Sequence, residues 1–207
     1  MITIIDYGLG NVRAFVNVYE RLNIKTKIAR SANDITGATR LILPGVGAFD
    51  YAMTRLDQSG MRSELERQVL QNNVPVLGIC VGMQILSKSS EEGLLPGLGW
   101  IDGHVKRFDV SEIPFKIHLP HMGWNTIKPE RENQLLNGLD DESRFYFLHS
   151  YYFICTHPSE TIATAEYGLR YACAVNKENI FGVQFHPEKS HGWGIRLLRN
   201  FAEISIV

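Results

Sequence analysis

The chain has 207 residues, of which 44% are hydrophobic and 21% charged, and its formal net charge is −1. This length can form one domain with a substantial core, which we expect to span residues 1–207, and the near-neutral charge gives no reason to expect nucleic acid or an anionic membrane as a partner. The three cysteines are not closely spaced, which argues against a disulfide framework and a cysteine-rich metal site, so no metal and no cofactor is expected.

The first part of the chain alternates short apolar runs with helical patterns. Strands are predicted at residues 2–5, 24–29, 40–43 and 74–79, and helices at 11–22 and 61–71. This alternation is typical of an α/β fold with a mostly parallel central sheet flanked by helices. The first residues lack the basic and apolar regions of a signal peptide, and no apolar run has the length of a membrane span. The cytoplasm is therefore the expected compartment.

The C-terminal half has a different pattern, because short strand-like segments follow one another with few helices between them. They lie at residues 100–108, 125–127, 145–148, 151–155, 161–167, 172–176 and 180–184, and a helix is predicted at 193–201. Such a run of short strands predicts additional antiparallel strands beside the parallel ones.

Cys80 lies in a tight turn between a predicted strand and a helix. Gly78 and Gly82 flank it at a distance of two residues, which is the spacing of a nucleophile elbow with a thiol in place of the usual hydroxyl. The turn lifts the thiol out of the sheet to a helix N-terminus, where backbone N–H groups and the helix dipole favour the thiolate. Most free cysteines are simply packed in cores, so a second feature is needed.

His186 and Glu188 supply that second feature at the end of another apolar strand. Side chains two residues apart on an extended chain point the same way, and Pro187 favours an extended chain. A carboxylate beside an imidazole can fix its tautomer and stabilise the imidazolium. Because ligands collect at the carboxyl ends of parallel strands, the pattern predicts a Cys80–His186–Glu188 triad.

The segment Pro-Gly-Val-Gly at residues 44–47 follows a further predicted strand. Its backbone N–H groups could form an oxyanion hole with the N–H of Val81, although an ordinary glycine-rich turn is equally compatible. The segment lacks the G-x-x-x-x-G-K-[ST] pattern, which excludes a nucleotide site of that kind.

These segments together resemble class I (triad) glutamine amidotransferases. The resemblance rests on residues 44–47, 78–84 and 185–190, and residues 120–125 and 146–151 narrow it to the glutaminase subunits of imidazole glycerol phosphate synthase. It extends over essentially the whole chain. It implies that a cysteine attacks the side-chain amide of L-glutamine, releases ammonia and leaves a γ-glutamyl thioester that water hydrolyses. It also implies a heterodimer with a (β/α)8-barrel cyclase subunit, which uses the ammonia to make imidazole glycerol phosphate and AICAR in histidine biosynthesis.

The resemblance assigns a catalytic role to each matched residue. Cys80 is the nucleophile, His186 the general base and then acid, and Glu188 its orienting partner. Val46 and Val81 supply the amides of the oxyanion hole. By analogy, the Val46 peptide turns over before the hole is complete, a movement that its two flanking glycines make sterically easy.

The resemblance also implies binding residues. Glutamine is held by Gly47, Gln84, Glu92, Ser150 and Tyr151, although a shift of one residue would exchange Glu92 with Glu91. The cyclase interface comprises Trp124, in a Met-Gly-Trp-Asn turn, with Asn11, Tyr146 and Lys189. Residue type alone allows a simpler role for each of these four: a core tryptophan, a helix N-cap, an amphipathic strand residue and a solvated loop charge.

The remaining cysteines and histidines receive no functional role. Cys155 and Cys173 lie in apolar runs and are expected to be packed. His118 and His121 have no nearby cysteine or acidic cluster, which makes a metal site a poor prediction. No catalytic role is assigned to His104, His149, His157 or His191.

Three alternatives remain open from the sequence. A paralogous glutaminase could feed another ammonia acceptor, such as a nucleotide-sugar amidotransferase, and the unusual Trp193 near the expected docking side leaves room for this. A cysteine peptidase or other hydrolase of similar fold would need no glutamine pocket and no partner. A non-enzymatic interaction protein would be unaffected by Cys80→Ala.

Overall fold

The computed structural model describes residues 1–109, 111 and 118–205. Within them, eleven strands form one central sheet with the path β2-β1-β3-β4-β13-β12-β10-β6-β5, and β11 and β8 extend it beside β12. Its parallel part comprises β1 (Ile2–Ile5), β2 (Thr26–Ala29), β3 (Leu41–Gly45), β4 (Val76–Cys80) and β13 (Ile180–Val183). The predicted mostly parallel sheet is therefore confirmed in the N-terminal half.

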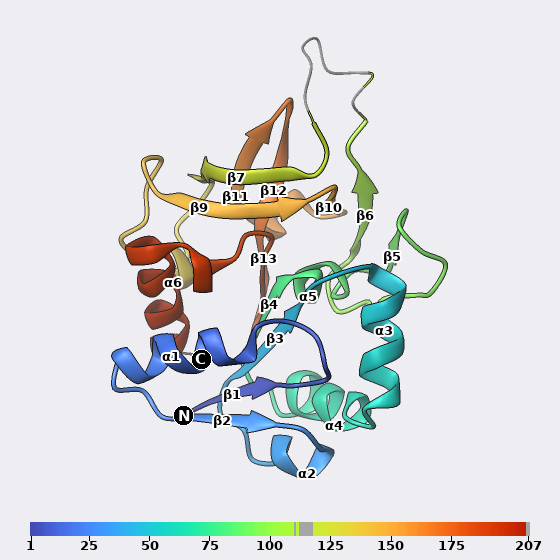
Figure 1. Ribbon diagram of the computed structural model, residues 1–207, viewed down its shortest axis with the longest axis vertical. Helices are drawn as coiled ribbons and strands as arrows, with labels where there is room; N and C mark the ends of the chain where they lie inside the picture. Colours follow the sequence, from blue (N-terminus) through green and yellow to red (C-terminus); the bar gives the residue numbers. More distant parts are fainter. Residues whose placement is uncertain (110, 112–117, 206–207) are drawn as a thin grey trace.

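The C-terminal half adds antiparallel strands, also as predicted. These are β12 (Leu169–Lys177), β10 (Tyr151–Cys155), β6 (Gly103–Arg107), β11 (Thr161–Tyr167) and β8 (Lys128–Pro129), while the short β5 (Ser89–Ser90) pairs in parallel with β6. A separate two-stranded antiparallel sheet joins β7 (His121–Thr126) to β9 (Arg144–His149). Figure 1 shows this small sheet crossing above the ends of the parallel strands.

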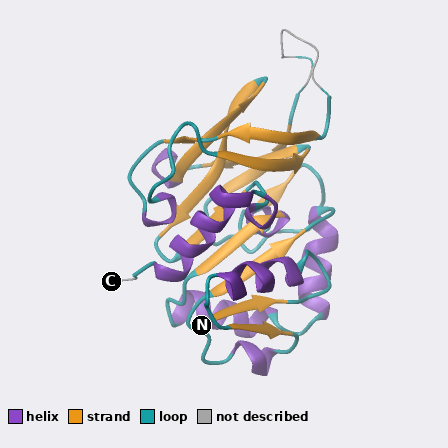
Figure 2. Ribbon diagram, turned by 60° about the vertical axis from the view of Figure 1, so that its left-hand side comes forward, coloured by secondary structure: helices purple, strands orange, loops and turns teal. Residues whose placement is uncertain are grey.

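Helices cover both faces of the parallel part (Figures 1 and 2). The helices α1 (Val12–Arg21) and α6 (His191–Glu203) lie together on one side, and α3 (Phe49–Gln58) and α4 (Arg62–Glu66) lie on the other. The shorter helical elements are α2 (Ala32–Ile35), η1 (Arg67–Gln71), α5 (Val81–Gln84), η2 (Gln134–Leu136), η3 (Pro158–Glu160) and η4 (Pro187–Lys189). None of the described helices is both long and apolar enough to cross a bilayer.

Helix α1 shows how spacing produces these layers. Phe15, Val16 and Tyr19 recur at helical intervals and are buried, because they lie on one face of the helix. The side chain of Asn11 accepts a hydrogen bond from the N–H of Ala14 at 3.1 Å, so it caps the helix, which begins at Val12.

Some predicted details were wrong, although the predicted bounds 61–71 agree within one residue with the helical segment that α4 and η1 form. The helix predicted at 61–71 is α4 followed by a π-helical turn, and the strand predicted at 125–127 begins earlier, at His121. Trp124 was predicted in a turn, but it lies within β7, which pairs with β9 along its whole length. Helices α2 and α3 and strands β5 and β8 were not predicted at all.

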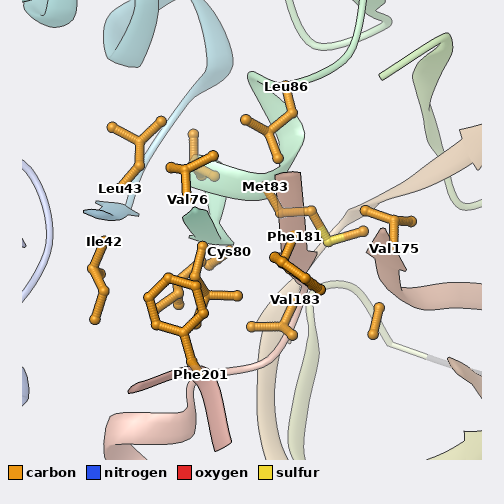
Figure 3. Packing of buried hydrophobic residues seen from close by; sticks show 14 of the residues in the cluster. Ile42, Leu43, Val76, Cys80, Met83, Leu86, Val175, Phe181, Val183 and Phe201 are labelled. Carbon is orange, nitrogen blue, oxygen red and sulfur yellow. The ribbon is translucent and has the colours of Figure 1, made fainter. Parts of the chain in front are cut away.

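The core beneath Cys80 is built from three neighbouring parallel strands and the helices on either side. Figure 3 shows Ile42 and Leu43 from β3, Val183 from β13, Met83 from α5 and Phe201 from α6 around this strand end. All five side chains are almost completely buried. Because interiors are close-packed, this cluster gives the turn at Cys80 a rigid floor.

Candidate active site

Cys80 ends strand β4 in the backbone conformation of a nucleophile elbow. Its φ is +56° and its ψ is −114°, values that an L-residue other than glycine seldom adopts. A Cβ atom on Gly82 would collide with the carbonyl oxygen of Leu43, and one on Gly78 would collide with the backbone of Gly82. The two glycines are therefore required because β3, β4 and α5 approach one another at backbone distance.

Three adjacent parallel strands bring the predicted site segments to the same edge of the sheet. Gly45 at the end of β3 is in register with Cys80, and Val183 at the end of β13 is in register with Ile79. The segment carrying His186 leaves β13 directly above this edge, where the N–H of His186 donates to the carbonyl of Tyr146. The edge is where ligands bind in open α/β sheets.

His186 and Glu188 form a buried pair beside Cys80. The imidazole Nδ1 lies 2.9 Å from Glu188 Oε1, and the two side chains are 4% and 3% exposed. Burial lowers the pKa of His186, but the hydrogen bonds to Cys80 and Glu188 and the negative charges of both groups outweigh it and raise the pKa to about 10. An imidazolium is therefore favoured next to the sulfur.

The backbone that joins this pair differs from the prediction. We expected His186 and Glu188 to share an extended edge, but residues Pro187–Lys189 form a 3-10 turn. Proline at the first position of a helical turn has a suitable φ and needs no N–H partner. The turn folds the carboxylate back onto Nδ1, so that Nε2 is left for Cys80.

A cavity of about 290 Å³ opens at Cys80. Its lining includes all the predicted catalytic, oxyanion-hole and glutamine-binding residues except Glu188, namely Cys80, His186, Val46, Val81, Gly47, Gln84, Glu92, Ser150 and Tyr151. Pro120, Leu148, His149 and Lys189 also line it and were not predicted to do so. A larger hollow of about 680 Å³ lies elsewhere, but the described residues that line it include no cysteine or histidine.

Glu92, and not Glu91, lines this cavity. Glu92 Oε2 accepts a hydrogen bond from the N–H of Phe49 at 2.9 Å, and partial burial raises the pKa of the carboxyl group. Glu91 instead accepts from the N–H of Arg107, outside the cavity. A carboxylate in this position can bind the ammonium group of an amino acid.

Gln84 is buried and does not face solvent. Its Nε2 donates to the carbonyl of Tyr151 at 3.3 Å and to Gln184 Oε1 at 3.0 Å. Gln184 itself is completely buried, and its Nε2 lies 3.8 Å from Cys80 Sγ. Sequence reasoning missed Gln184, although a polar residue within the apolar run 180–185 was a signal that could have found it.

The segment that would supply the oxyanion hole lies at the mouth of the cavity. Val46 is 43% exposed and is flanked by Gly45 and by Gly47, whose φ is +97°. Val81, directly after Cys80, is buried. The residue Val46 is therefore exposed directly after the buried end of β3.

Three of the four predicted interface residues lie together. Trp124, which is 41% exposed, meets Tyr146 edge-on with ring centroids 6.3 Å apart and stacks on His191 at 5.2 Å. The ammonium group of Lys189 lies 5.6 Å from the centre of the Tyr146 ring. Asn11 has the role of helix cap described above.

The other cysteines differ in burial. Cys173 is fully buried, whereas Cys155 is only partly so, and burial raises the pKa of the Cys155 thiol to about 11. Among the residues that the structure describes, no three or more histidine, cysteine or acidic side chains form a group that could hold a metal ion.

Comparison with known proteins identifies the family. The model of the family "Glutamine amidotransferase class-I" matches residues 3–204, and the chain belongs to this family. It is 56% identical to the imidazole glycerol phosphate synthase subunit HisH of Bdellovibrio bacteriovorus over 99% of this chain and all of the relative, and 50% identical to the subunit HisH of Leptospira interrogans over the same shares. A crystal structure of a glutamine amidotransferase matches with a TM-score of 0.74 and 22% identity, over 98% of this chain and 97% of that one, which supports the fold.

Proposed function

We propose that this chain is the glutaminase subunit of an imidazole glycerol phosphate synthase, and that Cys80, His186 and Glu188 are its catalytic triad. The observation that carries the proposal is the buried 2.9 Å contact between His186 and Glu188 beside the sulfur of Cys80, at the wall of a cavity whose lining includes Glu92. The chain's membership of the class I family and the names of its relatives support the same function.

Catalysis begins when His186 takes the proton of the Cys80 thiol as general base, and Sγ attacks the side-chain amide carbon of glutamine. The imidazolium of His186 donates its Nε2 proton to the leaving nitrogen, and ammonia departs as the carbon–nitrogen bond breaks. A γ-glutamyl thioester remains on Cys80. His186, now neutral, removes a proton from water, which attacks the thioester, and glutamate leaves as the carbon–sulfur bond breaks.

The pocket residues hold glutamine in the position that this attack requires. Glu92 is suited to the α-ammonium group, and the Ser150–Tyr151 segment and Gln84 supply further polar groups to the lining of the same cavity. The N–H groups of Val46 and Val81 stabilise the oxyanion. Because the Val46 segment is exposed at the cavity mouth, we propose that it reorients when a partner binds.

The proposed partner is a (β/α)8-barrel cyclase subunit that receives the ammonia, with both subunits in the cytoplasm. Trp124, Tyr146 and Lys189 form an exposed aromatic and cationic surface near the cavity, which suits a protein interface. Docking there would cover the cavity and keep ammonia from bulk water.

An electrophilic chloroketone analogue of glutamine tests this function. The analogue is incubated with the purified chain, alone and with the cyclase subunit, and the labelled peptide is identified by mass spectrometry. We expect labelling at Cys80, protection by glutamine, and no labelling of Cys80→Ala at this peptide. Labelling that glutamine does not reduce would contradict a glutamine pocket at Cys80.

A further inference from the structure

A connected set of buried polar side chains runs from the β7–β9 sheet to the sulfur of Cys80. It comprises His121, His149, Tyr171, Gln84 and Gln184, and all five are almost completely buried. Each has a hydrogen-bonding neighbour within the set, as buried polar groups require. The proposed mechanism uses only Gln84, as a pocket residue, so the other four call for an explanation.

The carbonyl of Tyr151 determines which way the two glutamine amides point. A carbonyl oxygen can only accept, so the Gln84 atom that lies 3.3 Å from it must be the donor Nε2. The second N–H of that nitrogen then faces the Gln184 side chain at 3.0 Å, which requires Oε1 of Gln184 there. The Nε2 of Gln184 is consequently the group that lies 3.8 Å from Cys80 Sγ.

The same carbonyl also fixes the tautomer of His149. Nδ1 of His149 lies 2.8 Å from Tyr151 O and must carry the proton, so the neutral ring has an acceptor at Nε2. Nδ1 of His121 lies 3.1 Å from that acceptor, and the hydroxyl of Tyr171 lies 3.2 Å from both. Two bare lone pairs cannot face each other at this distance, so Nδ1 of His121 also carries a proton.

The neighbours of His121 agree with this assignment. Asn125 Nδ2 donates to the carbonyl of Glu166, and its Oδ1 accepts from the N–H of Thr126, which fixes the orientation of the amide. The donor Nδ2 therefore faces Nε2 of His121 at 3.5 Å, where a lone pair is expected. Burial lowers the pKa of both histidines, to about 4 for His121 and about 3 for His149, so both rings are neutral near pH 7.

We propose that Gln184 is a further catalytic residue, whose Nε2–H donates to the Cys80 thiolate, and that Gln84 and His149 position it through the carbonyl of Tyr151. The proposal rests on the glutaminase function proposed above. An N–H donor stabilises the thiolate before attack. It acts again when the thioester is hydrolysed, because the carbon–sulfur bond breaks and its electron pair returns to Sγ.

Alkylation of Cys80 by iodoacetamide tests the donor without requiring turnover. Only the thiolate reacts, so the rate constant reports the thiolate fraction. The test variant Gln184→Met keeps a similar volume and removes the donor. The matched control is Gln68→Met, because Gln68 is similarly buried but contacts Glu64 and Asn72 on the α4–η1 segment. Mass spectrometry follows the Cys80 peptide, so that Cys155 and Cys173 do not interfere.

We expect Gln184→Met to lower the alkylation rate constant of Cys80 about tenfold on the acidic side of its pH profile, where thiol and thiolate compete, the size typical of one hydrogen bond to a charged group. Gln184→Glu should lower it further, because a carboxylate then faces the sulfur. Gln68→Met should leave it unchanged. An unchanged rate constant in folded Gln184→Met, checked by its circular dichroism spectrum, would overturn the proposal.

Two further measurements separate this inference from the proposed function and from simple destabilisation. Failure of wild-type protein with its cyclase to release glutamate would refute the glutaminase function, whatever the alkylation result. Nitrogen-15 spectra of the His121 and His149 rings directly test the tautomers on which the positioning of Gln184 depends. The variants His149→Asn and His121→Asn assign the resonances. Both rings should show Nδ1–H and bare Nε2 at pH 7. A proton on Nε2 of either ring would contradict the proposed positioning of Gln184.

Discussion

Cys80 combines a strained backbone with a thiol that contacts His186. Positive φ at a non-glycine residue costs of the order of 1–3 kcal/mol, and surrounding structure must over-determine it. The close approach of Leu43 to Gly82 and the buried side chains beneath the strand end supply that support. The strain therefore fits a functional position better than a packed core cysteine.

Cys80 and Glu188 together raise the pKa of His186. The pKa of His186 is raised from its ordinary value near 6.5 to about 10. In the folded protein the imidazolium is therefore the main form of this ring up to about pH 10. We predict that Glu188→Gln lowers this pKa, because it removes one of the groups that raise it, and that it lowers glutaminase activity about 10²–10⁴-fold. A proton NMR titration of the His186 ring checks the first effect. An unchanged titration midpoint would show that Glu188 does not act on His186.

At the scale of the element, the elbow depends on the absence of a side chain at Gly82. We predict that Gly82→Ala destabilises the fold by about 1–3 kcal/mol or more, because the new methyl group would meet backbone atoms of β3 that cannot move aside. Urea unfolding gives the free energy. The control is Gly192→Ala in α6, where a Cβ has open space and the change should stay within about 0.5 kcal/mol. Equal stability of the two variants would contradict the packing described.

The β7–β9 sheet carries a second prediction, which concerns pH. The folded pKa values of His121 and His149 lie below the unfolded value near 6.5, so the unfolded state binds more protons between about pH 4 and 6.5. Stability is therefore lost as the pH falls through this window, by up to about 1.4 kcal/mol per pH unit for each histidine.

Urea unfolding at pH 7.0, 6.0 and 5.0 measures this loss. His121→Phe should reduce the slope of stability against pH, because one neutral buried imidazole is removed. His104→Gln, at an exposed position on β6, is the control and should leave the slope as in the wild type. A slope that the His121 variant does not change would refute the assignment of a neutral buried ring.

Sequence patterns predicted the elements whose signals are local. The α1 spacing, the elbow glycines and the His-x-Glu pair all lie within short segments, and the structure has an element or contact at each. Strand β7 was mostly missed because Gly123, with a φ of +132°, and exposed alternate residues resemble a turn. Its strand conformation depends on pairing with β9, whose residues lie 18 to 28 positions further along the chain than their partners.

The candidate site divides in the same way. Cys80 and His186 were predictable because each residue type is unusual in its local pattern. The contacts of Gln184 and His149 were not, because they depend on how β13 and α5 pack against β10 and how β9 packs against β7, β10 and β12, which short-range spacing does not encode. The choice between Glu91 and Glu92 likewise needed the position of the Phe49 N–H, which lies over forty residues away in sequence.

At the scale of the whole molecule, the exposed surface around Trp124 lies beside the cavity that contains Cys80. We predict that Trp124→Ala weakens binding of the cyclase subunit at least tenfold, because an exposed tryptophan that stacks on His191 is typical of an interface hot spot. Isothermal titration calorimetry measures the affinity. Tyr51→Ala removes a more exposed aromatic ring on α3 and should leave the affinity unchanged. Equal losses in both variants would place the interface elsewhere.

We propose that Cys80 is the nucleophile of a glutaminase that supplies ammonia to a cyclase subunit. The most direct measurement is glutamate release from glutamine by the purified chain, alone and with the cyclase subunit and its nucleotide substrate analogue. We predict slow release alone, stimulation of about 10²–10³-fold by the partner, the size of one oxyanion-hole donor, and loss of all activity in Cys80→Ala. Rapid release without the partner, or activity that survives Cys80→Ala, would contradict the account.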